Sequence, residues 1–286
     1  MKKTALVLGG GGARGWAHIG VIQALNEQNI PITHIAGTSI GALVGAFFAA
    51  GTLDILRKNA LEIDWKKTLG YLDPVLPKSG LIRGHKITSF IRQYLGVSLI
   101  NEAAIPFCAV ATDLISSREV VFSHGDMVEA VRASISIPGI FTPVKNGDSL
   151  LVDGGLINPL PVDVARNMGA DQVIAVDLNS TQLGHSLTAE QQTAGQQEEN
   201  ASDNPGKEWR TGNPNRKEMN IFEILTATTN IIEVQITRAK LAVHPPELLI
   251  SPNLGHIDYL EFTKAEAAIS IGYDEARRCL ETAGWR

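Results

Sequence analysis

Apolar runs of strand length alternate with segments of helical periodicity from the first residues onward. The composition of Thr4–Leu8 predicts a buried strand, and Trp16–Asn29 carries its apolar residues at the spacing of one helix face. A second strand is predicted over Ile32–Ala36, and a helix of small and apolar residues over Ile40–Ala50. In this part of the chain, therefore, a glycine-containing turn and a helix follow each strand.

The same alternation continues toward the C-terminus. Further helices are predicted over Leu53–Trp65, Ile87–Leu95, Ile221–Val243 and Lys264–Ala283, and further strands over Phe107–Ala111, Glu119–Phe122, Ser149–Val152, Val173–Val176 and Leu248–Ile250. Strands that alternate with helices build a mostly parallel sheet that is covered on both faces. We therefore expect an α/β fold with three layers, in which the functional site lies at the carboxyl ends of the strands.

One long polar segment interrupts this pattern. Between Leu178 and Ile221 there is no Ile, Val, Phe or Tyr, and Trp209 is the one aromatic residue. Such a segment buries too little apolar surface to offset the entropy lost on ordering. We predict a disordered polar insertion over residues 180–219 within a single domain of residues 1–286, either inert or acting as a lid over the site.

Composition and charge narrow the class of protein. The 286 residues are 44% hydrophobic and carry a formal net charge of −5, whereas a nucleic-acid-binding protein would be expected to show a basic patch. The longest apolar run, Ile40–Gly51, is too short to span a bilayer. Met1-Lys2-Lys3 leads directly into the first predicted strand and leaves no room for a signal sequence. We expect a cytoplasmic globular enzyme.

A glycine-rich loop, Gly9–Gly15, follows the first predicted strand. At a strand-to-helix turn, such a loop presents backbone N–H groups and the positive end of a helix dipole to an anion. Gly10, Gly12 and Gly15 also have the spacing of a dinucleotide-binding loop. That fold needs an acidic residue at the end of the second strand to hold the ribose, but the sequence there is Gly37-Thr38-Ser39. Nucleotide binding is therefore disfavoured.

The segment Gly37-Thr38-Ser39-Ile40-Gly41 has the pattern of a nucleophile elbow. It lies between a predicted strand and a predicted helix, as an elbow requires. A Cβ atom at Gly37 or Gly41 would crowd the tight approach of strand and helix. The simpler interpretation is that Ser39 only caps the following helix. Together with the glycine loop as an oxyanion hole, the elbow favours ester hydrolysis by a serine nucleophile.

A serine nucleophile needs a base, and none of the histidines has the pattern of one. They lie on predicted helices or strands, in polar surroundings or in the polar segment: His18, His34, His85, His124, His185, His244 and His256. Asp153 is a better candidate, because it ends the strand Ser149–Val152 and enters the turn Gly154-Gly155, which other groups can approach closely. The alternative for Asp153 is an ordinary turn-forming role.

With these motifs in hand, the chain resembles a bacterial patatin-like phospholipase, in the group that includes neuropathy-target-esterase-like proteins. Four blocks carry the resemblance, in order along Lys3–Leu178: Gly10-Gly11-Gly12-Ala13-Arg14-Gly15, Gly37-Thr38-Ser39-Ile40-Gly41, Ala133-Ser134-Ile135-Ser136-Ile137-Pro138-Gly139-Ile140-Phe141 and Asp153-Gly154-Gly155. The resemblance implies a patatin-like fold and a Ser-Asp dyad of Ser39 and Asp153, with no histidine, metal or cofactor.

The resemblance also implies an oxyanion hole made by the glycine loop. Its donors are expected among the N–H groups of Gly10, Gly11, Gly12 and Ala13, with Ile40 after the nucleophile. Arg14 is expected either to order this loop, to attract a lipid phosphate, or to anchor a helix through a salt bridge.

The implied substrate is an acyl lipid or another carboxylic ester. Transient contact with the inner face of a membrane is expected, and nucleic acid is not expected as a partner. Two alternatives stay open: a regulator of a membrane-associated signalling system that uses the same fold with little or no catalysis, and an acyltransferase that passes the acyl group to a thiol or alcohol.

Overall fold

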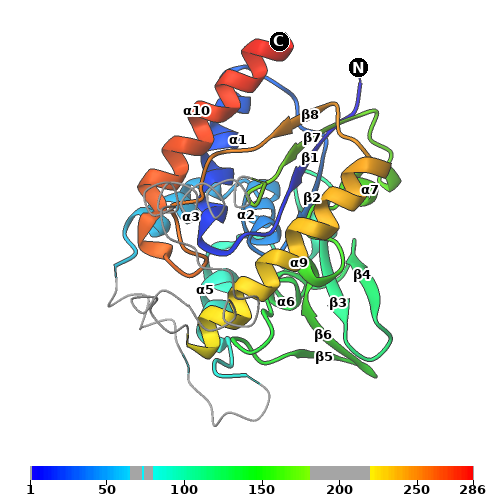
Figure 1. Ribbon diagram of the computed structural model, residues 1–286. Coiled ribbons are helices and arrows are strands. Elements are labelled where there is room, and N and C mark those ends of the chain that lie inside the picture. Colours follow the sequence, from blue (N-terminus) through cyan, green and yellow to red (C-terminus); the bar gives the residue numbers. More distant parts are fainter. Residues whose placement is uncertain (1, 65–72, 74–79, 181–219, 286) are drawn as a thin grey trace, which may run out of the picture.

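The computed structural model describes residues 2–64, 73, 80–180 and 220–285. A single sheet crosses its centre (Figure 1). The strands are β1 Thr4–Leu8, β2 His34–Thr38, β3 Phe107–Asp113, β4 Arg118–Phe122, β5 Val144–Asn146, β6 Ser149–Asp153, β7 Gln172–Val176 and β8 Leu248–Ile250. Seven of them lie in the order β5-β6-β3-β2-β1-β7-β8. The eighth, β4, pairs with β3 and lies outside this order.

The sheet is mixed and mostly parallel, as the alternation of strands and helices predicts. The four central pairs, β3 with β2, β2 with β1, β1 with β7 and β7 with β8, are parallel. The pairs of β3 with β4, β3 with β6 and β5 with β6 are antiparallel. Short turns join β3 to β4 and β5 to β6, which is possible because antiparallel neighbours need no long crossover between them, whereas β4, α6 and β5 lie between β3 and β6 in the chain.

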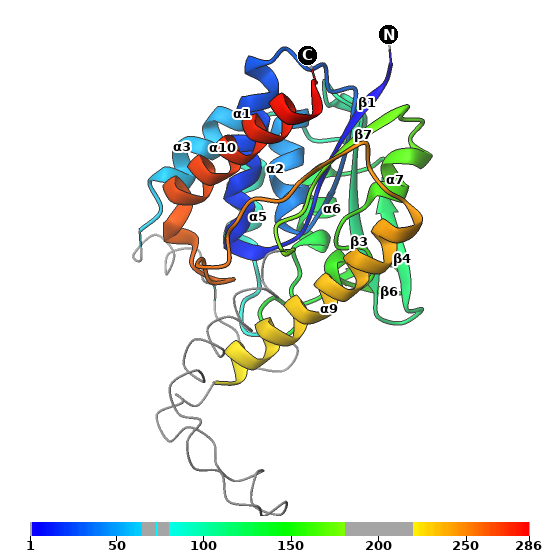
Figure 2. The same cartoon turned by 45° about the horizontal axis from the view of Figure 1, so that its top comes forward.

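Helices cover both faces of the sheet. The α-helices are α1 Ala17–Glu27, α2 Ile40–Ala49, α3 Leu53–Leu61, α5 His85–Tyr94, α6 Met127–Ser134, α7 Val162–Asn167, α9 Ile221–Val243 and α10 Ala265–Ala283, and the 3-10 helices are η1 Gly12–Trp16, η2 Ile100–Glu102, η3 Gly154–Leu156 and η5 Phe262–Lys264. Figures 1 and 2 show α1, α2 and α10 on one side of the sheet, with α7 and α9 on the other. The predicted three-layer α/β fold is therefore confirmed.

Two hydrophobic cores lie on the two faces of the sheet, and strand β1 contributes to both. Leu6 and Leu8 pack into the larger core under α1, α2 and α10. Ala5 and Val7 pack into the smaller core with residues of α7. Alternate residues of a strand point to opposite faces, so a strand buried on both faces needs a continuous apolar run. This explains why Thr4–Leu8 is apolar almost throughout.

The predicted elements differ from the structure mainly at their ends and in the short helices. The helix predicted over Leu53–Trp65 ends at Leu61, and Trp65 lies outside the described residues. Helices α6 and α7 were not predicted, because eight and six residues are too few to show a clear helical period. Residues 181–219 of the predicted insertion also lie outside the described residues. Within the described ranges, no helix is long and apolar enough to cross a membrane.

Candidate active site

Ser39 lies at the sharp turn between β2 and α2, with φ 56° and ψ −127°. A positive φ is uncommon for a residue with a side chain and marks a strained position. The flanking glycines permit the turn: a Cβ on Gly37 would lie 2.6 Å from the Gly41 carbonyl oxygen, and a Cβ on Gly41 would overlap with the Leu8 carbonyl. The turn has the geometry that the elbow pattern predicts.

Strand β3 brings Asp153 beside this turn. Along Phe107–Val110, β3 pairs with β2, which leads into Ser39. Along Ala111–Asp113 it pairs with β6 instead, with Ala111 opposite Asp153. Strand β4 occupies the other edge of β3, so β2 and β6 follow one another along the same edge. The end of β6 therefore meets the end of β2, although 114 residues separate Ser39 from Asp153.

The Ser39 hydroxyl donates a hydrogen bond of 2.6 Å to Asp153 Oδ2. The other carboxyl oxygen, Oδ1, accepts from the Gly155 amide at 2.8 Å, which fixes the orientation of the carboxyl group. Both side chains are almost fully buried. Burial raises the pKa of Asp153 to about 7, against the opposing effect of the hydrogen bonds from Ser39 and Gly155. The carboxylate is thus a much stronger base than an exposed aspartate.

Ser134 supports the elbow from α6, and sequence reasoning missed this role. The Ser39 amide donates to Ser134 Oγ at 2.8 Å, and the Ser134 hydroxyl donates to the Val110 carbonyl at 2.6 Å. Ser134 thereby satisfies the backbone of the strained turn and connects it to β3. Ser134 lies inside the third of the four blocks, but its contact with the Ser39 amide depends on the packing of α6 against the elbow and has no local pattern in the sequence.

The structure narrows the predicted oxyanion donors. The Gly10 amide donates to the Pro159 carbonyl at 2.9 Å, and the Ala13 amide donates to the Tyr259 carbonyl at 2.9 Å. Because neither N–H group is free for a substrate, the expected donor role of Gly10 and Ala13 is wrong for this conformation. Gly11 and Gly12 remain: no acceptor among the described residues engages the Gly11 amide, and Gly12 begins η1. The first N–H groups of a helix lack partners within it.

Arg14 is buried and orders the loop. Its Nε donates to the Ile257 carbonyl at 2.9 Å, its Nη1 donates to Asn179 Oδ1 at 3.2 Å, and the guanidinium lies 6.0 Å from the centre of the Tyr259 ring. With 5% of its surface exposed, it cannot reach a lipid phosphate in this conformation. No salt bridge of Arg14 is found among the described residues. Of the three expected roles, loop ordering is the one that fits.

His18, the histidine nearest the glycine loop in sequence, does not contact the dyad. It is fully buried on α1, and its Nε2 lies 2.9 Å from the Gly9 carbonyl oxygen. Burial lowers the pKa of His18 to about 4, so the ring is neutral at physiological pH. Its contact with Gly9 is structural, in line with the expectation that it hydrogen-bonds and does not accept the Ser39 proton.

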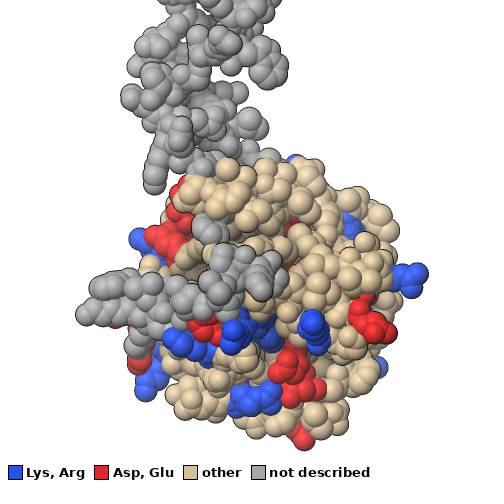
Figure 3. Space-filling view, turned by 90° about the horizontal axis from the view of Figure 1, so that it is seen from below, with Lys and Arg blue, Asp and Glu red and all other residues tan. Residues whose placement is uncertain are grey.

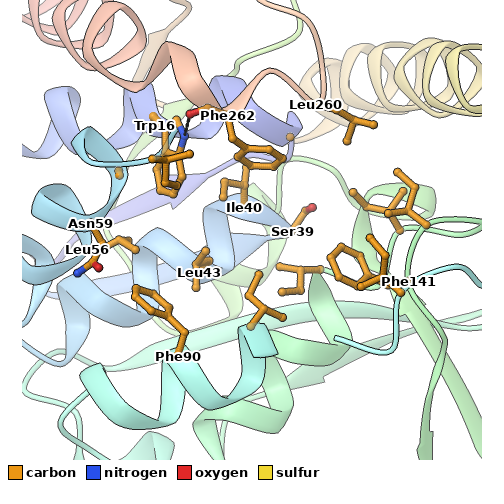
Figure 4. A pocket seen from close by; sticks show the side chains of 18 residues that line it. Trp16, Ser39, Ile40, Leu43, Leu56, Asn59, Phe90, Phe141, Leu260 and Phe262 are labelled. Carbon is orange, nitrogen blue, oxygen red and sulfur yellow. Dashed lines mark hydrogen bonds between the residues drawn. The ribbon is translucent and has the colours of Figure 1, made fainter. Parts of the chain in front are cut away.

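An apolar cavity of about 350 Å³ opens beside Ser39 (Figure 4). Its wall includes side chains from α2, α3, α5 and the segment around η5, among them Leu43, Leu56, Phe90 and Phe262, with Trp16 and Phe141 nearby. Pockets for small molecules commonly have volumes of about 300–1,000 Å³ and apolar walls with a few polar groups. Here Ser39 and Asn59 are the polar side chains of the lining, and Ser39 is the one that contacts Asp153. The cavity can therefore hold an apolar chain beside Ser39.

Comparison with known proteins identifies the family of this chain. The family model described as patatin-like phospholipase matches residues 6–166. An uncharacterized NTE family protein of Mycobacterium tuberculosis is 34% identical, over 98% of this chain and 91% of that protein. The chain belongs to the patatin-like phospholipase family. The glycine loop, the elbow, Ser134 and Asp153 all lie within the matched residues of this patatin-like chain.

Two further matches extend the comparison. The patatin-like chain is 40% identical to mouse patatin-like phospholipase domain-containing protein 6 over 62% of its own length and 13% of that larger protein. The crystal structure of VipD from Legionella pneumophila is also similar. The alignment covers 99% of the patatin-like chain and 67% of the VipD chain, with a TM-score of 0.48 and 14% identity.

Proposed function

We propose that this chain is a serine esterase that hydrolyses carboxylic esters of acyl lipids through a Ser39-Asp153 dyad. The observation that carries the proposal is the 2.6 Å hydrogen bond from Ser39 Oγ to Asp153 Oδ2 at the wall of an apolar cavity. Family membership supports a lipid hydrolase in general. The dyad assigns the reaction to two side chains of this protein.

In the proposed mechanism, Asp153 accepts the Ser39 proton as Oγ attacks the ester carbonyl carbon. The resulting tetrahedral intermediate collapses when protonated Asp153 returns the proton to the leaving alcohol oxygen, which breaks the ester bond and leaves the acyl group on Ser39. Water then attacks the acyl carbon and gives a proton to Asp153, which passes it to Ser39 Oγ as the bond between Oγ and the acyl group breaks and the fatty acid is released. A base works best when its pKa is near the working pH, and burial brings the pKa of Asp153 to about 7.

The negative oxygen of the tetrahedral intermediate needs hydrogen-bond donors beside Ser39. We assign this role to the N–H groups of Gly11, Gly12 and Ile40. Gly12 and Ile40 begin η1 and α2, so the positive ends of two helices point toward the developing charge. A single oxyanion donor is typically worth about 3–4 kcal/mol of transition-state stabilisation.

The acyl chain of the substrate would occupy the apolar cavity, and its ester group would lie at Ser39. Transient contact with a membrane surface would deliver such a substrate. Leu260 lines the cavity and is 43% exposed, and α9 carries exposed apolar side chains at Ile221, Ile224 and Leu225. Figure 3 shows an uncharged area on the described surface, with basic and acidic side chains around its margins. Apolar side chains of this kind bind weakly and reversibly to a lipid interface.

Covalent labelling with a fluorophosphonate, followed by peptide mapping, tests the proposal. We expect one adduct, on Ser39, which is lost in Ser39→Ala and greatly slowed in Asp153→Asn. Ser149→Ala is the matched control, because Ser149 lies on the same strand as Asp153 but donates to Asp113 instead. Turnover of a medium-chain ester should follow the labelling in all four proteins.

The alternatives predict other results. A native chain that neither labels nor hydrolyses esters contradicts the proposal and favours the regulatory role. Acyl transfer to an added alcohol that exceeds hydrolysis favours the acyltransferase. Labelling of a serine other than Ser39, lost when a histidine is replaced, would contradict the dyad itself.

A further inference from the structure

A second buried carboxyl group lies next to the dyad. Glu233 belongs to α9 and is fully buried. The Tyr259 hydroxyl donates to its Oε1 at 3.2 Å, and Asn179 Nδ2 donates to its Oε2 at 3.0 Å. Among the described residues, no lysine or arginine forms an ion pair with Glu233. A buried carboxylate without a cation partner is costly, so this position needs an explanation.

Two glycines of the family motifs leave the space that Glu233 fills. A Cβ on Gly155 would overlap with Glu233 Oε1 and would lie 3.1 Å from Asp153 Oδ1. A Cβ on Gly10 would lie 3.5 Å from Glu233 Oε1 and 3.6 Å from Ser39 Cβ. The carboxyl group of Glu233 therefore sits between the glycine loop and the dyad.

Glu233 is also connected to the oxyanion loop through Asn179. The Asn179 side-chain amide donates both to Glu233 Oε2 and, at 3.3 Å, to the Gly10 carbonyl. Asn179 Oδ1 in turn accepts from Arg14 Nη1. A negative charge on Glu233 would thus lie beside the loop that is to bind the negative oxygen of the intermediate. The repulsion between the two charges would destabilise the intermediate.

Burial and the neighbouring Asp153 favour the protonated form of Glu233. Burial raises the pKa of Glu233 to about 8, and the charge of Asp153 adds to this rise. The hydrogen bonds from Tyr259 and Asn179 act in the opposite direction and lower the pKa, as does the Arg14 guanidinium, which has the smallest effect. The pKa of Tyr259 is raised well above its usual value, so the phenol stays neutral and can donate to or accept from a carboxylic acid. Two neighbouring buried carboxyl groups do not readily ionise together, and such a pair titrates in two coupled steps.

We propose that Glu233 is a positioning residue that works as a neutral acid: it holds a proton while Asp153 is ionised, and the site loses activity when Glu233 also ionises. The inference rests on the proposed ester hydrolysis. Protonated Glu233 keeps the tyrosine and asparagine contacts beside the glycine loop without adding a charge there. When Glu233 loses its proton to solvent, the new charge opposes the oxyanion.

The pH dependence of kcat/KM tests this inference. It is measured on the full chain from pH 5.5 to 10, with a butyrate ester and chromatographic detection of the released acid. The kcat/KM of the wild type should rise through about pH 7 as Asp153 ionises and fall above about pH 8 as Glu233 ionises. The fall should approach about tenfold per pH unit once Glu233 is mostly ionised. Glu233→Gln, which keeps the shape but has no proton to lose, should keep the rise and lose the fall.

Asp163→Asn is the matched control, because Asp163 on α7 binds Lys240 of the same helix α9 at 2.9 Å without facing the dyad. It should keep the alkaline fall. The inference is wrong if kcat/KM of Glu233→Gln falls at high pH as that of the wild type does. It is also wrong if kcat/KM of the wild type does not change from pH 7.5 to 10, or if Asp163→Asn abolishes the fall.

A second measurement separates this inference from the proposed function. In urea unfolding, the advantage of Glu233→Gln over the wild type should grow between about pH 5 and pH 8 and stay constant above that, because over this range the folded wild type holds a proton that the unfolded chain has lost. Absence of ester turnover would reject the proposed function, whereas a pH-independent stability difference would reject a neutral Glu233.

Discussion

Replacing Asp153 by asparagine should greatly slow ester turnover and, at neutral pH, make the folded protein more stable. Asparagine keeps the size of the side chain and can still accept from the Gly155 amide, but it cannot take the Ser39 proton. Loss of a general base commonly slows a reaction by about 10²–10⁴-fold. The gain in stability comes from removing a fully buried carboxylate that has no cation partner among the described residues.

The size of that gain follows from the pKa of Asp153. Burial raises it from 3.8 to about 7, and at about 1.36 kcal/mol per pH unit the ionised folded state costs on the order of 4 kcal/mol. The pKa is higher in the folded than in the unfolded chain, so the contribution to stability is complete below about pH 4. It is lost progressively as the pH rises to about 7. Asparagine has no such dependence.

Urea unfolding at pH 5 and pH 7 measures this difference at two values at which Glu233 of the folded wild type is mostly protonated. The free energy of unfolding of Asp153→Asn, relative to the wild type, should increase by about 2–3 kcal/mol between these two pH values. Asp113→Asn serves as the control: hydrogen bonds from Ser116 and the Ile115 amide lower the pKa of Asp113 to about 2, so its effect should be constant over this range. A stability difference for Asp153→Asn that does not change with pH, or retained turnover, would refute the reasoning.

Two further predictions concern the elbow and the cavity. Gly41→Ala should destabilise the protein by about 1–3 kcal/mol or more in thermal unfolding, because the new Cβ overlaps with the Leu8 carbonyl. Gly45→Ala on the same helix meets only side-chain atoms at 3.0 Å or more and should cost much less; equal losses would contradict the role of Gly41. Leu43→Trp should fill part of the cavity and lower kcat/KM for long acyl chains on the order of 100-fold, at about 0.8 kcal/mol for each excluded CH₂ group, with little effect on acetyl esters. A uniform loss over all chain lengths would mean that the cavity does not hold the acyl chain.

The fold and the order of the motifs could be predicted from the sequence because both depend on local patterns. A continuous apolar run such as Thr4–Leu8 identifies a strand buried on both faces. The elbow around Ser39 needs glycines at fixed positions to avoid steric overlap, and those glycines are visible in the sequence. The short helix α7 escaped prediction because six residues do not establish a period.

The composition of the site was decided by the tertiary structure. The sequence alone does not show that β2 and β6 follow one another along the same edge of β3, which is what places Asp153 against Ser39. The amides of Gly10 and Ala13 donate to carbonyl groups of segments that are distant in the chain. The sequence therefore does not reveal that these two amides are unavailable as oxyanion donors. Glu233 lies on an ordinary amphipathic helix in the sequence, and only the packing of α9 over the glycine loop removes it from water and brings it to the dyad. Local patterns determine which residues can turn, cap or span the sheet, whereas burial and proximity depend on segments that are far apart in the chain.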